Sequence, residues 1–134
     1  MDDEVRGLLE EALAGCLRGV VACAVVTGDE EGTRPDEYVA VVAAAAENRA
    51  IGVYLIDLEV RVVVPADDSV AVANAKLRLR AICDYLDDLA CPFRTYEAGG
   101  VHVFGYRLMQ LDNKRGMRSK ADIITLKIGA RATT

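Results

Sequence analysis

The residues from Val53 to Val64 constrain the fold more than any other part of the chain, because every second residue is apolar and charged residues occupy three of the positions between them. Successive side chains of a β-strand point to opposite faces, so this spacing predicts a strand with one face in the core. We expect the other face to meet water or another subunit. The apolar positions are Tyr54, Ile56, Leu58, Val60, Val62 and Val64, and the charged positions are Asp57, Glu59 and Arg61.

Two segments have the spacing of helices with one apolar stripe. The first spans residues 3–18, and the second follows Pro65 and the capping residues 66–69. Their apolar positions recur three or four residues apart, as a helix lying on a sheet requires. In the first helix they are Val5, Leu8, Leu9, Ala12, Leu13, Cys16 and Leu17; in the second they are Val72, Ala75, Leu79, Ile82 and Leu86.

Other apolar, β-branched runs predict further strands over residues 20–26, 38–46, 101–111 and 121–130. Residues 93–100 read as a short extended piece that ends in a glycine turn. Residues 27–37 and 112–120 are polar and rich in turn formers, so we expect two solvated loops, the second a long hairpin loop. The element order α-β-β-β-α-β-β predicts a single α+β domain over residues 1–134. It would contain a mostly antiparallel sheet of about five strands with both helices packed on one face.

Charge is divided unevenly between the two ends of the chain. Residues 1–37 hold ten acidic residues and three arginines, a net charge of −7, whereas residues 112–134 hold six basic and two acidic residues, a net charge of +4. Two loops of opposite charge on one small domain suit a head-to-side contact between copies. The candidate contact residues for a subunit or partner are Asp29, Glu30, Glu31, Asp36, Glu37, Lys114, Arg115, Arg118 and Lys120.

The sequence contains none of the usual catalytic or cofactor motifs. His102 is the only histidine, and Cys16, Cys23, Cys83 and Cys91 are too widely spaced for a zinc or redox pair. We interpret the cysteines as small core residues, with a disulfide or metal role as the alternative. The glycines do not have the spacing of a phosphate loop. We therefore predict no enzyme activity, cofactor or metal.

The basic segment 112–120 is compatible with nucleic-acid contact, but no aromatic platform or reading helix accompanies it and the whole chain is acidic. The apolar runs are too short or too interrupted to cross a bilayer, and the acidic first residues do not have the pattern of a signal peptide. We expect a protein that is not secreted and has no membrane partner.

The order of these elements resembles the small tail-completion, tail-terminator and head-tail joining proteins of tailed bacteriophages and prophages. The resemblance covers nearly the whole chain, from the opening helix through "GVYLIDLEVRVVVPADDS" to the closing "ADIITLKIGA". It implies a structural subunit of a homo-oligomeric ring, often a hexamer, that caps the tail tube and meets other tail or connector proteins. It also implies assembly in the host cytoplasm into a virion, with the two loops making contacts between rings.

Two other functions remain open at this point. The chain could be a small regulatory or ligand-binding α+β module that holds a molecule between its sheet and its helices. It could also be an enzyme with a minimal site in which Cys83 or Cys91 acts with His102. A deep pocket in a monomer or dimer would favour the first alternative, and thiol alkylation that left the function intact would rule out the second.

Overall fold

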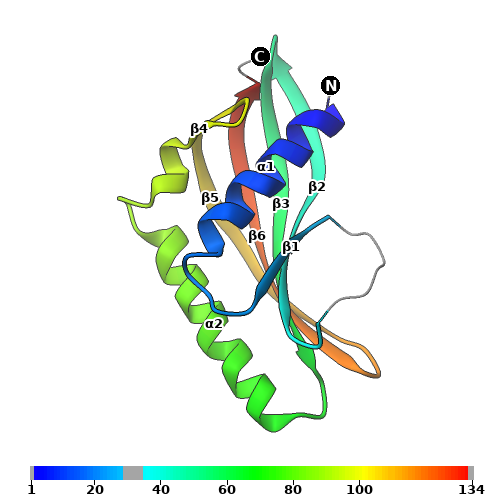
Figure 1. Ribbon diagram of the computed structural model, residues 1–134. Helices are drawn as coiled ribbons and strands as arrows, with labels where there is room; N and C mark the ends of the chain where they lie inside the picture. Colours follow the sequence, from blue (N-terminus) through cyan, green and yellow to red (C-terminus); the bar gives the residue numbers. More distant parts are fainter. Residues whose placement is uncertain (1, 29–34, 133–134) are drawn as a thin grey trace.

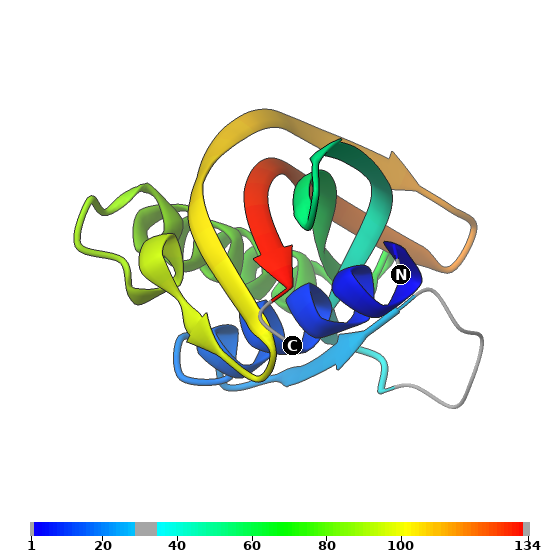
Figure 2. The same cartoon turned by 90° about the horizontal axis from the view of Figure 1, so that it is seen from above.

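The computed structural model describes residues 2–28 and 35–132, which form two α-helices and a six-stranded sheet (Figure 1). The strands lie in the order β1-β2-β3-β6-β5-β4, and every neighbouring pair is antiparallel except β1 and β2. The sheet is strongly curved (Figure 2). In chain order the elements are α1 (Asp2–Leu17), β1 (Ala24–Thr27), β2 (Tyr38–Ala50), β3 (Val53–Pro65), α2 (Ser69–Asp87), the 3-10 helix η1 (Pro92–Thr95), β4 (Glu97–Ala98), β5 (Val101–Arg115) and β6 (Ser119–Ala132).

The expected α+β class is confirmed, with differences in the short elements. The predicted strand over residues 20–26 begins only at Ala24, because the amides of Val20 and Val21 both donate to the carbonyl of Leu17 at the end of α1. The extended piece over residues 93–100 divides into η1 and the two-residue β4, which gives six strands instead of about five. Neither α-helix in the described part of the chain is long and apolar enough to cross a membrane.

The core lies between the helices and one face of the sheet. All six alternating residues predicted from Val53–Val64 are buried, and the register places Ile56 opposite Ile128 and Leu58 opposite Leu126. Apolar residues of both helices belong to the same cluster, so both helices cover the same face, as the sequence predicts. The largest fully buried side chains of the helices are Leu9, Leu13, Leu17, Ile82 and Leu86.

The opposite face of the sheet carries the charged residues of the central strands. Asp57 and Lys127 are cross-strand partners with their charged atoms 3.5 Å apart, and Glu59 accepts a hydrogen bond from Arg61 at 3.1 Å. These side chains are partly buried, because apolar neighbours such as Ile123 lie beside them. Partly exposed pairs of this kind contribute little to the free energy of folding.

A carboxylate supports each helix: one caps the start of α2, and the other joins α1 to the sheet. The side chain of Asp68 caps α2 by accepting from the amides of Val70 and Ala71 at 3.0 and 3.1 Å. In α1, Glu10 accepts from the amide of Ala43 in β2 at 2.8 Å. This amide lies two residues beyond Val41, the last β2 residue that pairs with β1. Glu10 therefore satisfies an edge donor at the point where the short β1 ends.

The segment 112–120 is not the long loop that the sequence predicts. Residues 112–115 extend β5, Ser119 and Lys120 begin β6, and only residues 116–118 connect the two strands. Arg115 pairs with Lys120, and Lys114 pairs with Ala121. The segment looked like a loop because no apolar alternation marks it. The strands are present here because β6 continues its pairing with β3 as far as Ser119 and Pro65.

Candidate interaction site

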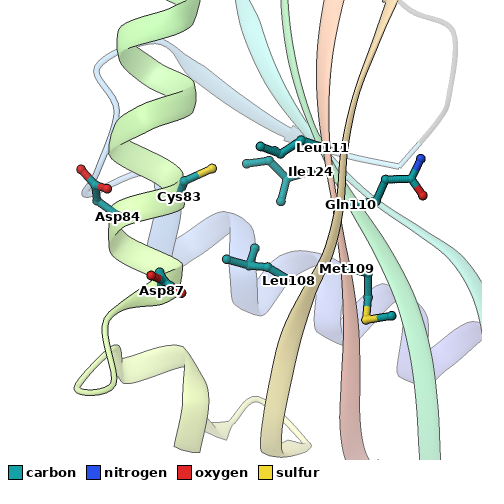
Figure 3. Close-up of a pocket in the computed structure, with 8 residues that line it drawn as sticks. All are labelled: Cys83, Asp84, Asp87, Leu108, Met109, Gln110, Leu111 and Ile124. Atoms are coloured by element: carbon teal, nitrogen blue, oxygen red, sulfur yellow. The ribbon is translucent and has the colours of Figure 1, made fainter.

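A groove runs between the C-terminal half of α2 and strand β5, with a volume of about 430 Å³ (Figure 3). We call it the α2–β5 groove. The side chains of Cys83, Leu108, Leu111 and Ile124 lie between the helix and the strands, whereas Met109 and Gln110 point to the far side of β5. The complete set of lining residues is Cys83, Asp84, Asp87, Leu108, Met109, Gln110, Leu111 and Ile124.

One end of the groove is closed by contacts that hold α2 against β5. The hydroxyl of Tyr106 donates to the carbonyl of Leu86 at 2.7 Å, and Arg94 donates to the same carbonyl at 2.9 Å. The Tyr106 ring also packs against Phe93, with centroids 5.5 Å apart, and beneath the Arg94 guanidinium. From Tyr106 toward the hairpin tip, β5 continues without such contacts to α2, so the groove is open in that direction.

The floor of the groove is core-facing surface that no helix covers. Leu108 pairs with Leu126 and Leu111 pairs with Ile124, so both leucines lie on the same sheet face as the core. Nevertheless Leu108 is 37% exposed and Leu111 is 63% exposed. The sequence placed these residues in a strand but did not predict their exposure. A register shift between Leu108 and Gln110 interrupts the alternation of the strand. Because of this shift, Leu108 and Leu111 share one face although they are three residues apart instead of two.

The α2 side of the groove is negatively charged. Asp84 and Asp87 are both exposed, and neither forms an ion pair with another residue in the described part of the chain. Burial raises the pKa of the Cys83 thiol above its ordinary value, and the carboxylates of Asp84 and Asp87 raise it further. The thiol therefore stays neutral near pH 7. An apolar floor beside two carboxylates suits an apolar group that is flanked by positive charge.

The predicted basic contact residues lie together on the β5–β6 hairpin. Lys114, Arg115 and Arg118 are exposed, and Lys120 is half-buried. Between them, Met117 is fully exposed at the tip. The sequence identified these charges but not the methionine, because a single methionine in a basic segment carries no periodic signal.

The predicted acidic residues fall into three situations. Asp36 is exposed, as a contact residue would be. Glu37 is half-buried and accepts a hydrogen bond from Arg78 of α2 at 2.8 Å, so it holds the start of β2 against that helix. Asp29, Glu30 and Glu31 lie outside the described residues.

The structure does not bring the cysteines and the histidine together as a catalytic pair. His102 lies 4.0 Å from its cross-strand partner Glu97 and packs edge-on against Phe104. Within the described residues no hydrogen bond joins it to Cys83 or Cys91. All four cysteines are free thiols, with Cys91 buried and the others half-buried, as expected for small apolar residues. No group of three or more metal-binding side chains occurs among the described positions.

Comparison with known proteins places the fold but not the family. No family model matches the chain, and no curated protein matches it in sequence. Among solved structures, a chain from the virion of a native gene transfer agent particle aligns with a TM-score of 0.66 at 16% identity, over 96% of this chain and 98% of that one. A second solved chain, whose name states no function, aligns with a TM-score of 0.55 at 19% identity, over 98% of this chain and 95% of that one. The whole domain therefore has a fold already seen in solved structures, including a component of a gene transfer agent virion.

Proposed function

We propose that this chain is a structural subunit of a phage-like particle and that copies of it assemble into a ring at the tail, as a tail terminator or head-tail joining protein. The observation that carries the proposal is the full-length match to a chain of a gene transfer agent virion. Because the match covers nearly all of both chains, it concerns the complete domain and not a common fragment such as a hairpin. Other particle proteins would then be its partners.

Two features of the described residues support assembly over catalysis. The α2–β5 groove has an apolar floor and carboxylates only along one side, with no set of converging donors and acceptors to orient a substrate. The basic hairpin is exposed along β5 over residues 107–115, through the connection, and at Ser119, so its surface is available to another chain. Interfaces between subunits use exposed surface of this kind, in which apolar side chains lie among charges.

The oligomeric state tests the ring directly. We expect light scattering coupled to size-exclusion chromatography, at high protein concentration and low salt, to give a mass of at least three subunits. Electron microscopy of the same fraction should show closed rings, because a heterologous contact closes when its rotation fits. A protein that stays monomeric at every concentration would contradict the ring. A monomer that binds a small molecule in the α2–β5 groove would instead favour the ligand-binding module.

A further inference from the structure

The tip of the β5–β6 hairpin presents one apolar side chain inside a cluster of positive charge. Met117 is completely exposed, and Arg115 and Arg118 on either side of it are exposed as well. Neither arginine side chain pairs with a carboxylate among the described residues. Methionine is unbranched and flexible, so it fills irregular apolar hollows well. An exposed methionine between two unpaired arginines therefore suits a contact in which the methionine inserts into an apolar pocket and the arginines pair with acidic residues around it.

The α2–β5 groove has the complementary composition. Its floor of Leu108, Leu111 and Ile124 is apolar, and Asp84 and Asp87 line its α2 side. Its volume of about 430 Å³ exceeds the volume of one methionine side chain, so it can also take part of the adjoining backbone. Hairpin tip and groove thus match in both polarity and charge.

The hairpin cannot fill the groove of its own chain. From Leu111, strand β5 continues for four residues to its end at Arg115, which is about 13 Å at 3.3 Å per residue. Met117 lies beyond that end, in the connection to β6. The hairpin tip therefore lies away from α2, which forms the other side of the groove (Figure 1). A hairpin of this kind can therefore enter the groove only from a second copy.

We infer that the α2–β5 groove receives the hairpin tip of a neighbouring copy of this chain. Met117 lies on the leucine floor, and Arg115 and Arg118 lie beside Asp84 and Asp87. The two surfaces are different patches of the same molecule, so the contact is heterologous and repeats from one subunit to the next. The inference rests on the proposed ring and specifies the interface that builds it.

The half-buried Cys83 in the groove provides a direct test. Unmodified protein is mixed with a Cys83→Ser/Met117→Cys variant and oxidised at mildly alkaline pH, and the disulfide-linked peptides are identified by mass spectrometry. We expect the dominant linkage to join Cys83 of one chain to the thiol introduced by Met117→Cys in the other. The matched control is Cys83→Ser/Ile51→Cys, because Ile51 is equally exposed but lies in the β2–β3 turn, at the opposite end of the sheet (Figure 1).

A charge exchange provides an independent measurement. Asp84→Lys/Asp87→Lys changes exposed residues only and should weaken self-association about tenfold or more. Arg115→Asp/Arg118→Asp should do the same on the other side of the contact. In a mixture of the two variants, both kinds of contact between unlike chains have paired charges again, whereas contacts between like chains remain repulsive, so light scattering should show that association recovers through alternating chains.

The outcomes separate the inference from the proposed function. Rings that form without the Cys83 linkage above the Ile51 control, and without recovery on mixing, would overturn the groove contact and leave the ring in place. That result would also leave the groove to another particle protein or to a small apolar molecule. A protein that stays monomeric and shows no specific linkage would overturn both.

Discussion

Tyr106 shows how a single side chain sets the geometry of the candidate site. Its hydroxyl donates to the carbonyl of Leu86 near the C-terminal end of α2, and its ring packs against Phe93 and beneath the Arg94 guanidinium. Burial raises the pKa of Tyr106 far above its ordinary value of 10, and contact with Cys91 raises it further. The neutral phenol is therefore strongly favoured in the folded state, and it is the neutral form that donates to Leu86.

This shift predicts how stability changes at high pH. Because the folded pKa is higher than the unfolded one, the contribution of Tyr106 is complete below about pH 10 and is lost as the pH rises above it. We expect the free energy of unfolding, measured in urea, to fall above pH 10. Tyr106→Phe should fall less steeply over the same range. It should cost only about 1 kcal/mol at pH 7, since Arg94 still donates to the carbonyl of Leu86. Equal slopes for the two proteins would contradict this account.

At this scale the sequence predicted charge better than exposure. The basic residues of the hairpin and the opposite net charges of the two ends of the chain follow directly from the sequence. The exposure of Leu108 and Leu111 is not, because it depends on how far α2 covers the sheet. Cys83 was interpreted as a small core residue, and only the course of α2 beside β5 places it in a groove.

At the scale of elements, Glu10 connects α1 to the sheet. Its hydrogen bond to the amide of Ala43 lies beside an irregularity in the pairing of β2 with β3, between Ala43 and Ala45. The contact is partly buried, so water replaces the carboxylate only incompletely when it is removed.

We expect Glu10→Ala to lower the free energy of unfolding by about 1–2 kcal/mol. Glu11→Ala is the control, because Glu11 is exposed and its hydrogen bond to Thr27 is at the surface. It should cost no more than about 0.5 kcal/mol. Hydrogen exchange at the Ala43 amide should also accelerate in Glu10→Ala alone. Equal losses in the two variants would show that the carboxylate of Glu10 does not hold α1 in place.

The strand boundaries explain why the elements were predicted well and the hairpin was not. Strand β3 alternates because one face lies in the core, and its predicted limits agree with the structure to one residue. The hairpin segment is exposed along β5. Because none of its β5 residues faces the core, apolar residues do not alternate there. Its strand pairing comes from the neighbouring β3, which is distant in sequence.

At the scale of the whole molecule, assembly should depend on the positive charge of the hairpin. We expect self-association, followed by light scattering, to weaken as salt rises from about 0.05 M to about 0.5 M, because screening shortens the range of the attraction. Arg118→Glu should weaken association at low salt. Arg49→Glu makes the same change in net charge at an exposed site of β2 and should leave association unchanged. If both variants behave alike, the effect is one of net charge and not of the hairpin.

The strand order also bears on how the chain reaches its fold. The last strand in sequence, β6, lies in the middle of the sheet and joins β3 to β5. Until β6 has left the ribosome, the β1-β2-β3 part and the β5 part of the sheet are not joined. The edge of β3 that pairs with β6 is then unpaired. Pairing between strands that are far apart in sequence slows folding, so partly folded states with exposed apolar surface and unpaired strand edges persist for longer. The sheet is therefore complete only after β6 has been synthesised, and shortening β6 would remove the strand that joins its two parts.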